Sequence, residues 1–255
     1  MSLQADDRGV SEVLGFVIVF GLVIASVGSV YAFGVGELRD VRDYERVNNA
    51  ERAFEVFADN VADVSRRGAP SRGTELKLAD STLGYGEATV NVTVDTTPGT
   101  PGDVNNSTGD ISLSPVVMTL QDAGEVRYAS GAVLRTDGGG PPRMVHEPDF
   151  VFAKDGVVVQ LVRSVPRGTT RVGGERIARI RTVDAGRSPL LTRSETNATL
   201  RIDVNSSYAP AWGDYLTSEG FACEPYTDAS TSVSCDLEDV SRVTVVRVTL
   251  RTTFE

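Results

Sequence analysis

Two cysteines, Cys223 and Cys235, and a single histidine, His146, are the side chains best suited to redox, nucleophilic or metal chemistry in this chain. The cysteines lie twelve residues apart, and the histidine is distant from both in sequence. Structural zinc sites use four nitrogen or sulfur ligands, so two thiols alone make a poor metal site. Outside the cytoplasm, where disulfides persist, we expect a Cys223–Cys235 disulfide.

No other residue pattern predicts a catalytic centre. One histidine leaves no Ser-His-Asp triad of the usual form, and we expect His146 to be a surface or loop residue. The glycine run 138–140 is followed by two prolines and cannot open a helix as a dinucleotide-binding loop does. The many carboxylates show no metal-ligand spacing and predict a solvated acidic face. The sequence therefore predicts no enzyme activity, no cofactor and no metal.

Asn-x-Ser/Thr triplets supply a second kind of chemistry, because they are acceptors for N-glycosylation where the compartment contains the transferase. Asn105 and Asn106 overlap, so we do not expect both to be modified together. The candidate acceptors, all after residue 90, are Asn91, Asn105, Asn106, Asn197 and Asn205.

Charge composition restricts the partners. The net charge is −10, and lysine occurs only at Lys77 and Lys154. Nucleic-acid binding needs clustered Lys and Arg, so an acidic chain disfavours it. An acidic, lysine-poor composition fits a protein soluble at high salt, as in a halophile, although a GC-rich genome would also favour arginine over lysine.

The chain begins with a candidate membrane anchor. An apolar run from Val13 to Gly36 contains no charged residue. A bilayer core needs about 20 apolar residues in a helix, so the run is long enough to span it. A cleaved secretory signal is the rival interpretation, with Val30-Tyr31-Ala32 as a small-residue cleavage site, but such signals have apolar regions of about 7–15 residues. The flanking charges alone do not decide the orientation.

Small residues recur along one face of this predicted helix, at spacings of three or four. In lipid, such a face lets a second helix approach closely and gain packing energy, although glycine and alanine are also simply common in spanning helices. The residues of this face are Gly21, Ala25, Gly28, Ala32 and Gly36.

The helical pattern continues beyond the apolar run. Apolar residues recur every three or four positions from Val41 to Val64, between charged residues, and predict an amphipathic helix. Gly68 and Pro70 are typical of a helix end, so we expect one helix from about Ser11 to Arg67. The apolar stripe comprises Val41, Tyr44, Val47, Ala50, Phe54, Phe57, Val61 and Val64.

From Glu75 onward the apolar period changes to two, which predicts strands. A short helix is expected over Tyr208–Glu219, and Asp155-Gly156 predicts a hairpin turn. The fold class is therefore α+β, a long helix followed by a β-rich head made of an antiparallel sheet or a sandwich. The expected strands are Glu75–Ala79, Glu87–Asp95, Val126–Arg135, Phe150–Ala153, Val157–Val162, Arg176–Val183, Ala198–Val204 and Val240–Phe254.

The segment Asp7-Arg8-Gly9-Val10-Ser11-Glu12-Val13-Leu14-Gly15 resembles the leader junction of archaeal type IV pilins and pilin-like proteins. The stretch Arg46–Phe54 is similar to pilin-like surface proteins of haloarchaea. The resemblance implies that a prepilin peptidase cuts between Gly9 and Val10, with Arg8 as the charged residue before the cut. Glu12 then becomes the third mature residue, where many archaeal pilins have proline. It either pairs with a neighbour's new N-terminal amine or is solvated at the interface.

This resemblance implies a domain plan and a place in the cell. Residues 1–9 would be a leader, 10–36 the transmembrane part of the helix, 37–68 its amphipathic extension, and 69–255 the β-rich extracellular domain. The expected function is a non-catalytic subunit, a minor pilin or pseudopilin, of a surface filament or secretion-type assembly. Its partners would be the peptidase, other pilin-like subunits and membrane lipid.

Two alternatives remain open. In the first, the chain is a permanently anchored surface protein whose head binds a ligand, glycan or partner without forming a filament. In the second, it is an anchored extracellular hydrolase, which would need a pocket with convergent carboxylates. The first predicts an uncleaved N-terminus.

Overall fold

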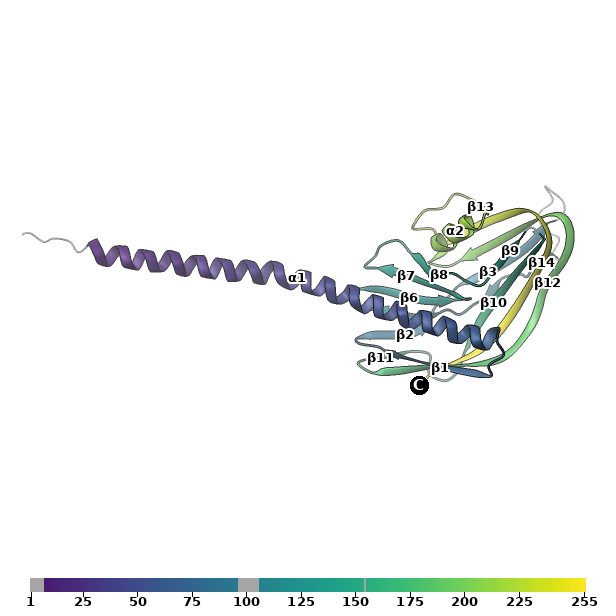
Figure 1. Cartoon of the computed structure of the whole chain (residues 1–255), viewed down its shortest axis with the longest axis horizontal. Helices are drawn as coiled ribbons and strands as arrows, with labels where there is room; N and C mark the ends of the chain where they lie inside the picture. The colour runs from purple at the N-terminus through teal and green to yellow at the C-terminus, as the bar shows by residue number, and fades with distance from the viewer. Residues whose placement is uncertain (1–6, 96–105, 154) are drawn as a thin grey trace, which may run out of the picture. The chain divides into compact units, whose positions relative to one another are not determined.

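A computed structural model describes residues 7–95, 106–153 and 155–255 (Figure 1), without the side chains of residues 7–12, 32–40, 195 and 196. The chain forms two compact units, Met1–Glu45 and Arg46–Glu255, which we describe separately. We call the second unit the head. It contains the second part of the first helix and all of the described strands.

Helix α1 spans Asp7–Ser65 and joins the apolar run and the amphipathic stripe in one element. It ends two residues before the expected Arg67. Gly68 follows in a left-handed conformation with φ of 77°, and the Ala69 amide donates to the Asp63 carbonyl at 3.0 Å. Glycine adopts this conformation without a steric penalty, which explains the stop at this point.

The β-strands of the head form two sheets (Figure 1), so the expected α+β plan of a helix followed by a β-sheet domain is confirmed. Eight strands form one sheet in the order β4-β3-β12-β14-β10-β9, with β1 on β12 and β13 on β14. The other sheet has the order β11-β2-β5-β6-β7-β8. The bounds are β1 Ser71–Lys77, β2 Ser81–Tyr85, β3 Thr89–Asp95, β4 Ile111–Ser112, β5 Val116–Leu120, β6 Gly124–Ala129, β7 Ala132–Asp137, β8 Arg143–His146, β9 Val151–Ala153, β10 Gly156–Pro166, β11 Val172–Gly174, β12 Ile177–Asn205, β13 Ala222–Cys223 and β14 Ser232–Phe254.

Several expected strand boundaries are wrong. The expected strand Val126–Arg135 is a hairpin of β6 and β7, with Ser130 and Gly131 at its turn in left-handed conformations. The expected strands Arg176–Val183 and Ala198–Val204 are parts of one strand, β12, which absorbs Gly186 and Pro189 through register shifts against β14. Bulges of this kind bend a strand without ending it. The short helix α2, Ala209–Ser218, lies within the expected range.

The pairing of β10 with β14 is parallel, while the other strand pairs of the described residues are antiparallel. Its register runs without a shift from Val157 beside Val243 to Pro166 beside Thr252. Along this pair the buried positions change from odd numbers, such as Val245, to even numbers, such as Leu250. Successive side chains of a strand point to opposite faces, so the two ends of the pair bury opposite faces.

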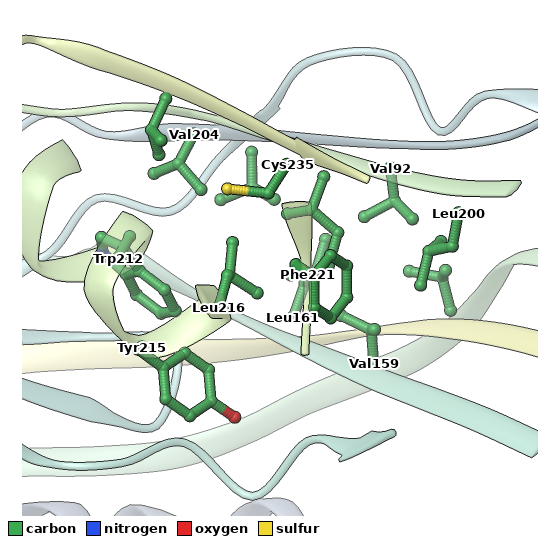
Figure 2. Close-up of a cluster of buried hydrophobic side chains, with 14 of the residues drawn as sticks. Val92, Val159, Leu161, Leu200, Val204, Trp212, Tyr215, Leu216, Phe221 and Cys235 are labelled. Carbon is green, nitrogen blue, oxygen red and sulfur yellow. The ribbon is translucent and has the colours of Figure 1, made fainter. Parts of the chain in front are cut away.

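The head consequently has two apolar cores. The first contains α2 and the odd-numbered residues at the start of β10 and β14; Figure 2 shows part of it, with Trp212 and Leu216 from α2 beside Cys235. The second contains the buried stripe of α1, the six-stranded sheet, and the end of β14. The amphipathic part of α1 therefore helps to build the head.

Candidate functional site

The segment Val13–Tyr31 of α1 is long and apolar enough to cross a membrane, with a mean hydropathy of 2.6 over 19 residues. All of its side chains are exposed. The hydroxyl groups of its serines are hydrogen-bonded within the helix: Ser26 donates to the Val23 carbonyl at 2.8 Å, and Ser29 donates to the Ala25 carbonyl at 2.9 Å. Satisfied polar groups are what a lipid environment demands. By length and composition the segment fits a single-pass anchor or a signal sequence.

The described glycines of the small-residue face have open space beside them. A methyl group added to Gly21 or Gly28 would meet no heavy atom within 4 Å. Ala25 lies between these glycines, while the side-chain surroundings of Ala32 and Gly36 lie outside the described residues. The face is thus accessible to a second helix at the three described positions.

The expected processing junction lies at the first turns of α1, which begins at Asp7. The side chains of Arg8, Val10 and Glu12 lie outside the described residues, as does the immediate environment of Gly9. The pairing of Glu12 and the cut after Gly9 therefore stay predictions.

The second part of the α1 stripe is buried in the head, with Phe54 at 0% exposure and Phe57 at 1%. Val41 and Tyr44 were expected on the same stripe, but each is 61% exposed in the N-terminal unit. Burial begins at Val47, next to the start of the head at Arg46.

A buried arginine joins this part of α1 to the six-stranded sheet. Arg135 on β7 is 2% exposed, and its Nη1 donates to Glu51 Oε2 at 2.5 Å and to Asn48 Oδ1 at 2.7 Å. Its Nε donates to Asp137 Oδ1 at 2.6 Å. Burial alone would lower the pKa of Arg135, but the hydrogen bonds to Glu51 and Asp137 outweigh it and raise the pKa. The arginine is held charged between helix and sheet.

The end of α1 is fixed by side chains from the other sheet. Arg187 on β12 donates from Nη2 to the Val64 carbonyl at 3.1 Å, and so satisfies a carbonyl at the end of the helix. Asn60 donates to Thr74 on β1 at 2.9 Å. The helix is therefore anchored by polar contacts to both sheets as well as by its apolar stripe.

The cysteines form a disulfide, as expected. Cys223 on β13 and Cys235 on β14 are direct partners in the ladder, with Cα atoms 4.0 Å apart. The bridge closes the loop that follows α2, and Cys235 is fully buried beside Trp212 and Leu216 (Figure 2). It thus holds β13 and the loop against the first core.

His146, at the end of β8, lines a cavity of about 210 Å³ whose wall is formed by the end of α1, by the six-stranded sheet and by β10. Arg66 and Asp149 form an ion pair of 2.7 Å at this cavity, and Ser130 and Gln160 add polar atoms to its wall. Among the described residues no group of three or more His, Cys, Asp or Glu is arranged to hold a metal ion.

The candidate glycosylation sites differ in their surroundings. The Asn91 amide is engaged, because its Oδ1 accepts from Ser107 at 2.8 Å and its Nδ2 lies 3.4 Å from Asp203 Oδ2. Asn106 Oδ1 accepts from Arg193 at 2.6 Å. Asn197 and Asn205, both on β12, are exposed, and Asn105 lies outside the described residues.

Sequence reasoning missed the buried arginines. Besides Arg135, Arg127 on β6 is 7% exposed, pairs with Glu125 at 2.8 Å and lies 4.3 Å from the centroid of the Tyr208 ring. In a strand of alternating polar and apolar residues, an arginine is normally interpreted as a residue that faces solvent. No local sequence pattern distinguishes it from an arginine that is buried together with its counter-ion.

Comparison with known proteins assigns the chain to a family whose function is unknown. No curated protein matches the chain, and no solved structure matches it. One family model, described as "Family of unknown function (DUF7289)", matches residues 8–253 and so covers both the apolar helix and the head. The chain therefore belongs to this family of unknown function, DUF7289.

Proposed function

We propose that this protein is a non-catalytic, type IV pilin-like subunit of a cell-surface filament or secretion-type assembly, in the manner of a minor pilin or pseudopilin. The observation that carries the proposal is the division of α1. Its side chains from Val13 to Tyr31 are exposed and apolar, whereas its stripe from Val47 to Val64 is buried in the head. Exposed apolar surface of this extent needs lipid or other helices to cover it.

The same apolar segment would serve before and after assembly. In the membrane it would act as a single-pass anchor, because its length matches the hydrocarbon core. In an assembly, the small face at Gly21, Ala25 and Gly28 would let helices of other pilin-like subunits pack closely. The buried second part of α1 would transmit load from that helix bundle to the head.

Placement of the head outside the cell is part of the proposal. A disulfide is typical of oxidising compartments, and Cys223 and Cys235 are bonded. The high ratio of arginine to lysine and the net charge of −10 suit a haloarchaeal surface protein. On this account Asn197 and Asn205 are the best-exposed glycan acceptors of the described sequons.

A permanently anchored binding protein is the second candidate. The cavity beside His146, with the Arg66–Asp149 ion pair, favours it, because a small polar ligand could be held there without any filament. This candidate requires an intact N-terminus and no dependence on a prepilin peptidase.

Expression in cells with and without the prepilin peptidase separates the two. The pilin-like account expects the protein to accumulate in an uncleaved form without the peptidase, and expects Gly9→Ile to block cleavage in its presence. Gly15→Ile is the matched control, since it adds the same bulk to the apolar helix after the junction. Equal mobility of all forms on a denaturing gel would favour the permanently anchored protein.

A further inference from the structure

One face of the eight-stranded sheet gathers cationic side chains near the C-terminal end of the chain, where β1, β12, β14 and β10 lie side by side (Figure 1). We call it the arginine face. Its members are Lys77, Arg163, Arg179, Arg181, Arg247 and Arg251.

The strand register shows that these side chains share one face. Arg181 pairs with Thr253, two positions from Arg251, and Arg163 pairs with Thr249, between Arg247 and Arg251. Directly paired residues of neighbouring strands point to the same face, as do residues two apart on one strand.

The β1 strand extends the same face. Arg179 pairs with Glu75, which lies two positions from Lys77 on β1. The guanidinium of Arg179 lies over Gly73, where an added methyl group would meet its Nε at 2.6 Å.

The arginine face is exposed to solvent, because at this end of the sheet the opposite face packs against the second core. At this end of β14 the even-numbered residues, such as Val248 and Leu250, fill the second core. The odd-numbered residues therefore point to solvent, and Arg179, Arg181 and Arg251 are exposed. The change of buried face along the β10–β14 pair thus leaves a sheet surface for the arginines.

The six cations of the arginine face outnumber the carboxylates beside them, which are Glu75 and Glu255, the ladder partners of Arg179. Within residues 7–95, 106–153 and 155–255, none of the six forms an ion pair. The Nε atoms of Arg163 and Arg247 are buried and have no hydrogen-bond partner among those residues. The whole chain has a net charge of −10, whereas this face has an excess of positive charge. An anionic partner would neutralise that excess.

The opposite charge is concentrated elsewhere in the same head. Between Arg201 and Arg242 the sequence has no Lys, Arg or His. This stretch forms α2, β13 and the beginning of β14, and its exposed carboxylates make up what we call the acidic corner. The acidic corner comprises Asp214, Glu219, Glu224, Asp228, Glu238 and Asp239.

Tyr215 on α2 lies near one carboxylate of the acidic corner, Glu219, and near two carboxylates outside it. Burial raises the pKa of Tyr215, and the negative charges of Glu219, Glu147 and Asp149 raise the pKa further.

The two charged regions cannot neutralise each other within one chain. They lie toward opposite ends of the β12–β14 pair, in which Arg181 lies beside Thr253 at one end and Asn205 beside Ser232 at the other. Arg247, Glu238 and Asp239 lie between these ends. The length of the ladder keeps these two regions apart, so they can pair with each other only between molecules.

We propose that the arginine face of one copy of this chain binds the acidic corner of a second copy. Two different surfaces of the same molecule then meet, which is a heterologous contact that repeats from copy to copy. The contact joins heads and does not require cleavage of a leader, so it goes beyond the proposed function and is tested separately from it.

Lysine scarcity makes the contact testable by carbodiimide cross-linking, which condenses a carboxylate with an amine that touches it. Lys77 lies on the arginine face and is one of two lysines. A mixture of ¹⁵N-labelled and unlabelled full-length chain in detergent, at low salt, should give labelled-to-unlabelled links between Lys77 and the acidic corner. Lys77→Arg, which keeps the charge but removes the amine, should lose them.

Charge reversal tests the same contact without a reagent. Arg179→Glu, Arg181→Glu and Arg251→Glu together should weaken self-association at low salt at least about tenfold in sedimentation analysis, because like charges then face each other. Glu219→Arg, Asp228→Arg and Glu238→Arg together should do the same. Combining both sets in one chain should restore association, which a folding defect would not do. Salt should weaken wild-type association, and at the high salt of a halophile only ion pairs in direct contact would persist, because the Debye length is about 3 Å at 1 M.

Intermolecular links from Lys77 mainly to other carboxylates would overturn the proposal. So would wild-type association that survives both reversals, or failure of the combined variant to recover. A monomeric chain that binds vesicles containing phosphatidylglycerol through the arginine face would assign that face to a lipid surface instead of a second copy.

Discussion

Arg135 on β7 donates a hydrogen bond of 2.5 Å to Glu51 on α1, and only 2% of the surface of this arginine is exposed to solvent. This pair makes the second part of α1 a component of the head. The proposed pilin-like function would need such a connection, because force at the helix would have to reach the β-sheet domain.

We expect Glu51→Gln to lower the free energy of unfolding of the head by about 2 kcal/mol, because it leaves a buried guanidinium with only part of its counter-charge. Glu55→Gln, one turn later on α1, is the matched control without an ion pair among the described residues. Denaturant unfolding of the full chain in detergent measures both. Equal stabilities would contradict the role given to the Arg135–Glu51 pair.

Phe54→Ala should lower the free energy of unfolding by about 3–5 kcal/mol, because Phe54 is fully buried and the substitution leaves a cavity. Val56→Ala on the same helix should change it by about 0.5 kcal/mol or less, since Val56 is 55% exposed. A small effect at Phe54 would mean that α1 does not contribute to the second core.

Replacement of Cys223 and Cys235 by serine should lower the free energy of unfolding by about 3 kcal/mol, as expected for a short loop in the chain-entropy description. Because Cys235 is fully buried among apolar side chains, replacement of both cysteines by alanine is the control that removes the cross-link without burying a hydroxyl group. As a chemical check, alkylation of the unreduced, denatured chain should leave its mass unchanged. Two added alkyl groups would show free thiols.

The end of α1 should make the stability of the head depend on pH. Hydrogen bonds from Arg72, at 2.9 Å, and from Arg67 lower the pKa of Asp63. A carboxyl whose pKa is lowered by folding stabilises the fold above its unfolded pKa, about 3.9, and loses that contribution as the pH falls through its folded pKa.

Asp63→Asn should therefore lower the melting temperature of the head at pH 7, and the difference from wild type should shrink below about pH 4. Asp59→Asn, at an exposed position of the same helix, should change it less at both pH values. A difference for Asp63→Asn that is independent of pH would rule out the charge of Asp63 as its source.

The helix was predictable because its signals are local. Val47, Phe54 and Phe57 repeat at helical spacing, and Gly68 supplies the stop. The exposed positions of Val41 and Tyr44 were not predictable, because the same stripe continues through them and only the tertiary structure determines where the head begins.

The sheet was predictable only in outline. Ser130-Gly131 is a weak turn signal, so one strand was expected where β6 and β7 form a hairpin. Gly186 and Pro189 suggested a break in β12, yet bulges accommodate them. The parallel pairing of β10 with β14 depends on contacts between distant segments, and alternation within a strand carries no information about it.

Of the candidate site, the sequence could predict the disulfide, because two cysteines allow only one pairing within the chain. It could not predict the burial of Arg127 and Arg135, nor that Arg163, Arg181 and Arg251 share one face. Those relationships depend on strand register, which joins residues far apart in sequence.

N-terminal sequencing of the mature protein from its native membrane tests the central claim most directly. A pilin-like subunit cut after Gly9 begins Val10-Ser11-Glu12, and this is the result we predict. A mature protein that begins at Met1, or at Phe33 after signal cleavage, would contradict the account.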